Sequence, residues 1–331
     1  MNKKILVTPR TFGKADPVPM QMLKEAGCEV ISNPYGRLLT EEEISELIQD
    51  VDGIIVGLDP LNASVLSKAE RLKAISKYGV GVNNIDLEYA TERGIIVANT
   101  PGANSLAVAE LAIGLMFAVS RRICVSDRNI RQGKWQQYPG LQIKGKTIGL
   151  IGTGQIGRHT GELARGLGME VICFDLYPNE EWAESIDAKY VTLQEIITDA
   201  DFISIHVPLT DDTYHLISSK ELDQMKPSAA IINTARGGII DEQALYEALK
   251  DGKIAGAGLD VFETEPLTDS KLLELDNVVL TSHIGAHTRE ATENMGRLAA
   301  ANLLTILRGD IPKYVVNQIA DRGAENGSAS S

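Results

Sequence analysis

A glycine-rich segment that follows an apolar run constrains the fold of this chain more than any other feature. The run from Lys146 to Ile151 is typical of a buried strand, and Gly152, Gly154 and Gly157 follow it in G-x-G-x-x-G spacing. The first glycine permits a tight turn, the second lets backbone approach a pyrophosphate, and the third lets the next helix pack against the sheet. The pattern predicts a dinucleotide-binding strand–turn–helix unit, with an ordinary glycine-rich turn as the alternative.

An acidic residue after the next predicted strand indicates which dinucleotide. Asp175 follows the apolar run 170–174. A carboxylate at this point can accept hydrogen bonds from the adenosine ribose. The next residues, Leu-Tyr-Pro, supply no cation for a 2′-phosphate. We therefore expect NAD rather than NADP as the cofactor.

Strand-like and helical runs alternate along most of the 331 residues. A first set of short apolar runs lies between residues 5 and 99, and a second set lies between residues 147 and 282. Such alternation is typical of parallel sheets with helices on both faces. We predict an α/β protein with two doubly wound parallel-sheet domains, one a Rossmann-type cofactor domain and the other a flavodoxin-like substrate domain, with an interdomain cleft.

Two long helical segments set the predicted domain boundaries. One runs from Ser105 to about Arg131 and the other from Arg289 to Arg308, and an extended run at 313–317 follows the second. If both helices cross between domains, the tail returns to the first domain. The substrate domain then comprises residues 1–99 and 288–331, and the NAD-binding domain comprises residues 100–287. The Gly-, Ala- and Ser-rich residues 322–331 are predicted to be disordered.

Composition excludes several classes of partner. A formal net charge of −13 disfavours binding to nucleic acid or to an anionic membrane. The longest apolar segment, residues 106–119, is too short to span a bilayer and contains Glu110. With no signal peptide before the first predicted strand, we expect a cytoplasmic protein. The three cysteines are scattered and the five histidines show no metal-binding spacing, so we expect no metal.

Three side chains that suit acid–base chemistry follow strands of the second set. Arg236 comes after the run 229–234, Glu265 after 256–261, and His283 directly after 278–282. Ligands of open parallel sheets bind beyond the carboxyl ends of the strands. Each residue alone could be a surface ion pair, an exposed turn residue or a strand-end histidine. Together they predict a site at the nicotinamide end of the cofactor.

The chemistry of 2-keto acid reduction requires this combination. An arginine can hold the substrate carboxylate and polarise the ketone. A histidine can donate the proton that neutralises the developing alkoxide. A carboxylate beside the histidine stabilises its protonated form and fixes its tautomer. Arg236, His283 and Glu265 are therefore predicted to fill these roles.

A set of short motifs follows one another along the chain: KYGVGVNNID at 77–86, NTPGAN at 99–104, VAE at 108–110, GTGQIG at 152–157, HVPLT at 206–210, NTARG at 233–237, LDVF at 259–262 with EP at 265–266, and HIG at 283–285. In these motifs and their order, the chain resembles the D-isomer-specific 2-hydroxyacid dehydrogenase family from residue 3 to about residue 317.

The resemblance implies NAD as cofactor, a small anionic 2-hydroxy or 2-keto acid as substrate and a homodimer in which the 105–131 helix contributes the contact. It implies the same roles for Arg236, Glu265 and His283. The further positions that it implies are the amides of Gln155 and Ile156 at the pyrophosphate, Thr234 and Asp260 near the nicotinamide, His206, Pro208, Ala235 and Gly285 in cofactor-binding motifs, and the amides of Val80 and Gly81 at the substrate carboxylate.

Within this family we expect an enzyme of the phosphoglycerate dehydrogenase type. However, the loop at 58–62 lacks the arginine that these enzymes usually provide for the substrate phosphate. Arg10 and Lys77, which lie at strand ends, are candidates to hold a distal anionic group, or are solvated surface charges. The alternatives are a glyoxylate/hydroxypyruvate reductase and, from another class, an NAD-sensing corepressor.

Overall fold

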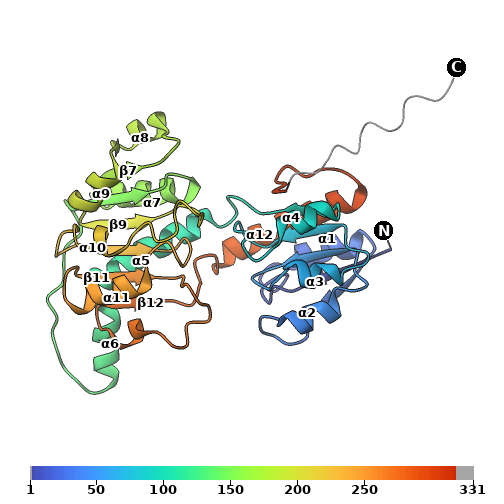
Figure 1. Ribbon diagram of the computed structural model, residues 1–331, viewed down its shortest axis with the longest axis horizontal. Helices are drawn as coiled ribbons and strands as arrows, with labels where there is room; N and C mark the ends of the chain where they lie inside the picture. Colours follow the sequence, from blue (N-terminus) through green and yellow to red (C-terminus); the bar gives the residue numbers. More distant parts are fainter. Residues whose placement is uncertain (1, 318–331) are drawn as a thin grey trace. The chain divides into compact units, whose positions relative to one another are not determined.

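The computed structural model describes residues 2–317, so the predicted disorder at 322–331 lies outside the described residues. The chain forms two compact units, each described by itself below. One unit comprises the chain up to Asn104 together with the chain from Thr288 onward, and the other comprises Ser105–His287. Figure 1 shows the elements of both units.

The first unit contains a five-stranded parallel sheet in the order β2-β1-β3-β4-β5, which is the flavodoxin-like order. Its strands are β1 (Lys3–Val7), β2 (Cys28–Ser32), β3 (Gly53–Val56), β4 (Ala74–Lys77) and β5 (Ile96–Ala98). Its helices are α1 (Val18–Glu25), α2 (Glu41–Leu47), α3 (Ala63–Ser67), α4 (Leu87–Glu92) and α12 (Arg289–Arg308).

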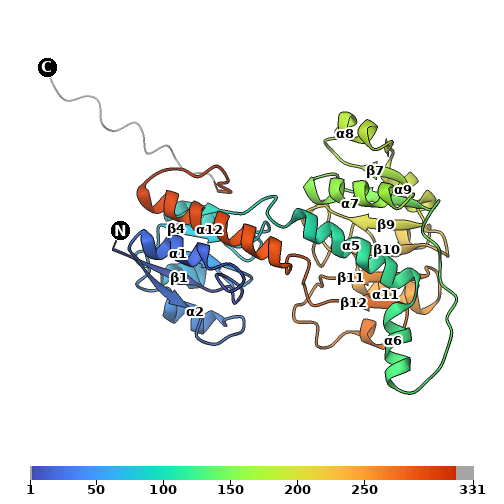
Figure 2. The same cartoon turned by 180° about the vertical axis from the view of Figure 1, so that it is seen from behind.

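The last helix and the tail complete this unit. Helix α12 packs on α1, β3 and β4, and the view from behind shows it beside α1 and β4 (Figure 2). After α12, the amide of Val316 donates to the carbonyl of Val97 at 2.9 Å. The chain after α12 therefore returns to the sheet edge at β5.

The second unit contains a seven-stranded sheet in the order β12-β11-β10-β9-β6-β7-β8, again with every pair parallel. Its strands are β6 (Thr147–Ile151), β7 (Glu170–Phe174), β8 (Lys189–Tyr190), β9 (Phe202–Ile205), β10 (Ala230–Asn233), β11 (Gly256–Leu259) and β12 (Val278–Leu280). Its helices are α5 (Ser105–Ser120), α6 (Ile123–Arg131), α7 (Gln155–Gly166), α8 (Glu180–Ser185), α9 (Leu193–Asp199), α10 (Ser219–Leu222), α11 (Glu242–Lys250) and the 3-10 helix η1 (Lys271–Glu274). This is the Rossmann-type order, so the predicted fold class of two doubly wound parallel sheets is confirmed.

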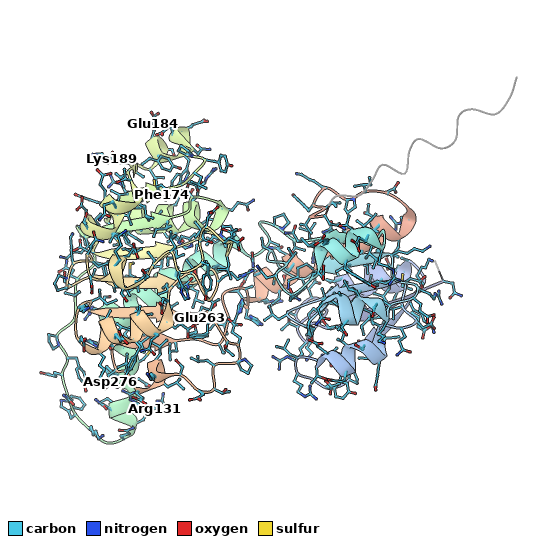
Figure 3. The ribbon with its side chains drawn as sticks, in the orientation of Figure 1. Arg131, Phe174, Glu184, Lys189, Glu263 and Asp276 are labelled. Atoms are coloured by element: carbon cyan, nitrogen blue, oxygen red, sulfur yellow. The ribbon has the colours of Figure 1, made fainter. Side chains whose placement is uncertain are left out.

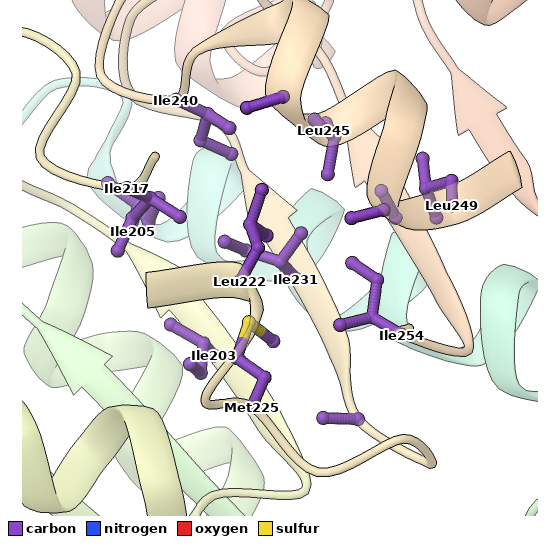
Figure 4. Packing of buried hydrophobic residues seen from close by; sticks show 14 of the residues in the cluster. Ile203, Ile205, Ile217, Leu222, Met225, Ile231, Ile240, Leu245, Leu249 and Ile254 are labelled. Carbon is purple, nitrogen blue, oxygen red and sulfur yellow. The ribbon is translucent and has the colours of Figure 1, made fainter. Parts of the chain in front are cut away.

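Alternation along the strands builds a core on each face of the second sheet. In β10, Ile231 belongs to one buried cluster and Ile232 to the other. The cluster around Ile231 includes Leu222 of α10 and Leu245 of α11, and Figure 4 shows this packing. Because helices cover both faces, the carboxyl edge of the sheet is left to carry loops.

The predicted single helix from Ser105 to about Arg131 is wrong. The structure has two helices, α5 and α6, separated at Arg121 and Arg122. Arg122 has a φ of 53°, in the left-handed region that ends a helix. The carbonyl of Ser120 accepts the amide of Leu141 at 2.8 Å, which fixes the break by a contact distant in sequence.

Candidate functional site

The turn after β6 leaves room for a ligand only at its middle glycine. Gly152 has a φ of 97°, which favours glycine. A Cβ atom at Gly157 would lie 2.1 Å from the carbonyl oxygen of Gly152, so helix α7 packs directly on the turn. A Cβ at Gly154 would meet nothing within 4 Å. The twelve-residue helix α7 starts at the next residue, and helix N-termini favour anions.

Asp175 directly follows β7 and lies beside this turn. Its carboxylate accepts from the amide and hydroxyl of Thr153, at 2.6 and 3.0 Å, and from the amide of Tyr177 at 2.9 Å. Burial raises the pKa of Asp175, but these hydrogen bonds and the charge of Arg158 outweigh it, so the net pKa is lowered. Asp175 is therefore an ionised acceptor. Sequence reasoning missed Thr153, which holds this carboxylate against the glycine turn.

Two buried polar atoms at the carboxyl edge of β9 and β10 have no hydrogen-bond partner among the described residues. They are Nδ1 of His206 and Oγ1 of Thr234. The other ring nitrogen of His206 lies 2.9 Å from the hydroxyl of Ser204, and burial lowers the pKa of His206 to about 3. Buried polar groups normally have a partner, so unpartnered ones beside a glycine cradle fit a polar ligand such as a dinucleotide.

Glu265 and His283 are in direct contact. Oε2 of Glu265 lies 2.7 Å from Nδ1 of His283, and the other carboxylate oxygen accepts from the amide of Phe262 at 3.1 Å. The two side chains are 30% and 28% exposed, so both remain partly accessible to solvent. Burial raises the pKa of Glu265, but the hydrogen bond and charge of His283 outweigh it and lower the net pKa.

Arg236 lies near this pair. Its Nη1 donates to the carbonyl of Ala235 at 2.6 Å. Burial lowers the pKa of the guanidinium, and the charge of Glu265 opposes that shift. The backbone at Gly237 lies against the Phe262–Glu263 peptide so closely that a Cβ would be 1.9 Å from the carbonyl oxygen of Phe262. The structure thus brings the loops of Arg236 and Glu265 together.

Asp260 organises the turn that carries His283. Asp260 is buried, with 1% of the residue exposed. Its carboxylate accepts from the amides of Ile284 and Gly285, both at 2.8 Å, and from the hydroxyl of Thr281 at 2.7 Å. His283 itself has a φ of 53°, in the left-handed region. The family resemblance implies that Asp260 lies near the nicotinamide, and this stays a prediction. The contacts of its carboxylate within the described residues are with the turn of His283.

The other predicted cofactor residues lie along the same strand ends. Gln155 and Ile156 are the first residues of α7, and the side chain of Gln155 accepts from Ser105 at 3.4 Å. Pro208 is exposed after β9, and the amide of Ala235 donates to the side chain of Asn233 at 3.0 Å. Their contacts to a cofactor stay predictions.

The predicted substrate residues of the first unit differ in how they are held. Lys77 is 3% exposed, and its ammonium donates to the carbonyl of Gly57 and to Asn84 at 2.8 Å. Arg10 is exposed and donates to the carbonyl of Gly36 at 3.1 Å. Val80 is exposed, and Gly81 is partly exposed. Lys77 is therefore buried and donates within its own unit, whereas Arg10 is exposed.

No group of three or more His, Cys, Asp or Glu side chains in residues 2–317 is arranged to hold a metal ion. Within the same range, every helix is too short or too polar to cross a membrane.

Comparison with known proteins gives consistent matches. Residues 113–285 match the model of the family described as "D-isomer specific 2-hydroxyacid dehydrogenase, NAD binding domain". The chain is 45% identical to a glyoxylate reductase of Thermococcus litoralis, covering 82% of this chain and 86% of that protein. It is also 45% identical to a D-3-phosphoglycerate dehydrogenase of Methanocaldococcus jannaschii, covering 95% of this chain but only 59% of that longer protein.

Solved structures agree over nearly the whole length. The TT0316 protein of Thermus thermophilus superposes with a TM-score of 0.86 at 37% identity, covering 95% of this chain and 99% of that one. The apo-structure of D-lactate dehydrogenase from Escherichia coli gives a TM-score of 0.83 at 33% identity, with coverage of 95% and 99%.

Proposed function

Because the chain belongs to the D-isomer specific 2-hydroxyacid dehydrogenase family, we propose that it interconverts a small 2-keto acid, such as glyoxylate or hydroxypyruvate, and the corresponding 2-hydroxy acid. The predicted family resemblance is confirmed, as are NAD as cofactor and an oxidoreductase that acts on CH–OH groups. The observation that carries the proposal is the Glu265–His283 contact beside Arg236.

The roles follow from the chemistry of each side chain. Bound NADH supplies the hydride in reduction, and NAD accepts it in oxidation. Arg236 binds the substrate carboxylate and polarises the carbonyl oxygen. In reduction, His283 donates a proton from Nε2 to that oxygen as the alkoxide develops, and in oxidation it removes the hydroxyl proton. Glu265 holds the ring through Nδ1 and stabilises its protonated form.

The first unit supports a substrate without a second anionic group. The loop at 58–62 has no cation, and its Asp59 is a buried carboxylate that accepts from Thr8 and from the amide of Leu39. A phosphate beside such a carboxylate is repelled. Lys77, the buried cation at the end of β4, already donates to Gly57 and Asn84.

A phosphoglycerate dehydrogenase is the second candidate function. It is favoured by the relative that covers 95% of this chain, and by the exposed Arg10, whose remaining donors could bind a phosphate. However, that relative is much longer than this chain, so its name says less about the substrate here.

A rate comparison tests the proposal. NADH oxidation should be measured with glyoxylate, hydroxypyruvate and 3-phosphohydroxypyruvate, for the natural chain and for Arg10→Ala. We expect kcat/KM to be highest for one of the unphosphorylated acids and to change less than twofold in Arg10→Ala. A preference for the phosphorylated acid that Arg10→Ala abolishes would establish the second candidate instead. NADH binding without turnover of any acid would favour the sensor class.

The cytoplasmic location of the protein stays a prediction. We also propose that the chain forms a homodimer. Large apolar side chains gather on α6 and the segment after it: Ile123 and Ile130 are each 51% exposed, and Trp135 is 86% exposed. Ile123 and Ile130 are seven residues apart, so they lie on one face of the helix. Light scattering should give twice the chain mass, and Ile130→Glu should shift it towards the monomer.

A further inference from the structure

A reciprocal pair of hydrogen bonds joins the loop of Glu265 to the start of helix α11. Glu242 is the first residue of α11, and its Oε1 accepts from the amide of Glu263 at 2.6 Å. In return, Oε1 of Glu263 accepts from the amide of Glu242 at 3.2 Å. Each side chain thus satisfies the backbone N–H of the other. Glu263, labelled in Figure 3, precedes Glu265 by two residues.

Other contacts hold the same loop from different sides. His215 Nε2 lies 3.2 Å from Oε1 of Glu263, and its ring stacks on Tyr214 with centroids 3.9 Å apart. Gly237 packs against the Phe262–Glu263 peptide, and the amide of Phe262 donates to Glu265. Hydrogen bonds and backbone packing therefore connect Glu242 to the carboxylate that contacts His283.

We propose that Glu242 is a positioning residue for the hydride-transfer reaction, acting through the loop 262–265. By accepting the Glu263 amide, Glu242 keeps the carboxylate of Glu265 aligned with Nδ1 of His283. Its charge also contributes to the field around that pair. The proposal rests on the proposed function, because the Glu265–His283 pair is the group that Glu242 is said to serve.

The ionisation of Glu242 depends on the charges around it, and its own charge acts on them in turn. Burial raises the pKa of Glu242, and the charges of Glu263 and Glu265 raise it further against the hydrogen bond from Glu263. The charged or titratable groups that face this cluster are Glu263 and Glu265 beside Glu242, Arg236 and His283 beside Glu265, His215 beside Glu263, and Asp241 beside His215. An ionised Glu242 adds negative charge beside Glu265, and negative charge there favours the binding of a proton by the Glu265–His283 pair.

Two substitutions separate position from charge. Glu242→Gln keeps an oxygen that can accept from the Glu263 amide but removes the charge, whereas Glu242→Ala removes both. Glu247→Gln is the matched control, because Glu247 is an exposed carboxylate on the same helix whose side chain contacts Gln243. For each variant, kcat and KM for NADH should be measured across pH with the best 2-keto acid, together with amide hydrogen exchange at Glu263.

We expect Glu242→Ala to lower kcat roughly tenfold, since small misalignments of reacting groups have effects of this size. Its KM for NADH should stay within about twofold of the natural chain, because the cofactor turn at residues 152–157 is untouched. Glu242→Gln should recover most of kcat while the alkaline limb of the reduction profile moves to lower pH. Exchange at the Glu263 amide should quicken in Glu242→Ala and not in Glu247→Gln.

Each outcome either supports or overturns the assigned role of Glu242. A wild-type kcat and pH profile in Glu242→Ala overturns the proposal, as does an equal change in Glu247→Gln. If Glu242→Ala fails to fold, an unshifted profile in Glu242→Gln overturns it. If the natural chain reduces no 2-keto acid, the proposed function fails, and the assigned role of Glu242 fails with it. The hydrogen-exchange comparison then tells whether the Glu242–Glu263 pair holds the loop at all.

Discussion

Replacing Asp260 by Asn tests whether one buried carboxylate holds the turn of His283. The two carboxylate oxygens receive three donors, which come from Thr281, Ile284 and Gly285. An Asn side chain can keep one oxygen in place, but its NH₂ group must then face an N–H or O–H donor. The loss of one hydrogen bond to a charged group, with a buried donor left unpaired, is worth about 1.5–3 kcal/mol.

This magnitude predicts both a stability and an activity effect. For a unit of this size, about 2 kcal/mol lowers Tm by roughly 4–8 °C. Because His283 holds a left-handed φ in this turn, a relaxed turn should also misplace its ring and lower kcat tenfold or more.

Scanning calorimetry and steady-state kinetics measure the two effects. Asp269→Asn is the control, because Asp269 is an exposed carboxylate in the segment between β11 and η1. If Asp260→Asn stays within about 0.5 kcal/mol of the natural chain with kcat unchanged, the reasoning is refuted, because the expected loss is about 1.5–3 kcal/mol.

Three other substitutions follow from the geometry. Gly157→Ala places a Cβ 2.1 Å from the carbonyl of Gly152, so it should destabilise the chain by about 1–3 kcal/mol and abolish NADH binding in a fluorescence titration. Thr234→Val removes a buried, unpartnered hydroxyl, so the Tm of the free protein should rise, while the increase in Tm on adding NADH should become smaller. A lower Tm of the free variant would show that the hydroxyl has a partner. Burial raises the pKa of Asp52, but a backbone amide and the Lys3 ammonium outweigh it and lower the net pKa. The contribution of Asp52 to the stability of the fold is therefore present above about pH 4 and is lost as pH falls through the depressed pKa. Urea unfolding at neutral and acidic pH should therefore show a weaker acid dependence in Asp52→Asn, and an identical dependence would contradict the assignment.

All strands except β8 could be predicted, because they lie in short apolar runs bounded by turn residues, which is the pattern of a sheet buried on both faces. The break between α5 and α6 could not. Arginine is a good helix former, so nothing local marks Arg121 and Arg122 as a helix end. The break depends on the bond between Ser120 and Leu141, which only the folded chain brings together. Strand β8 was missed because two residues carry no periodic signal.

For the site, the order of the strands along the chain predicted which side chains could meet, whereas the hydrogen bonds that hold them could not be predicted. The positions of Glu265 and His283 after neighbouring strands β11 and β12 were sufficient to predict that they could meet. The contacts of Asp260 with the His283 turn join residues more than twenty positions apart and depend on a left-handed residue, so no spacing rule predicts them. Likewise, the position of Lys77 at a strand end did not indicate that its ammonium is buried.

Three departures from stable packing in the second unit lie at one edge of its sheet. His206 and Thr234 follow the adjacent strands β9 and β10, and each leaves a buried polar atom unpartnered, at a cost of about 1–3 kcal/mol. His283, after β12, holds a backbone conformation that costs a further ~1 kcal/mol or more. Both faces of the same sheet are packed with apolar side chains. Stability alone would favour Val at 234 and Gly or Asn at 283, so the residues at this edge suit a bound ligand better than the free fold. Cofactor and proton donor are therefore expected to share that edge, as hydride transfer requires.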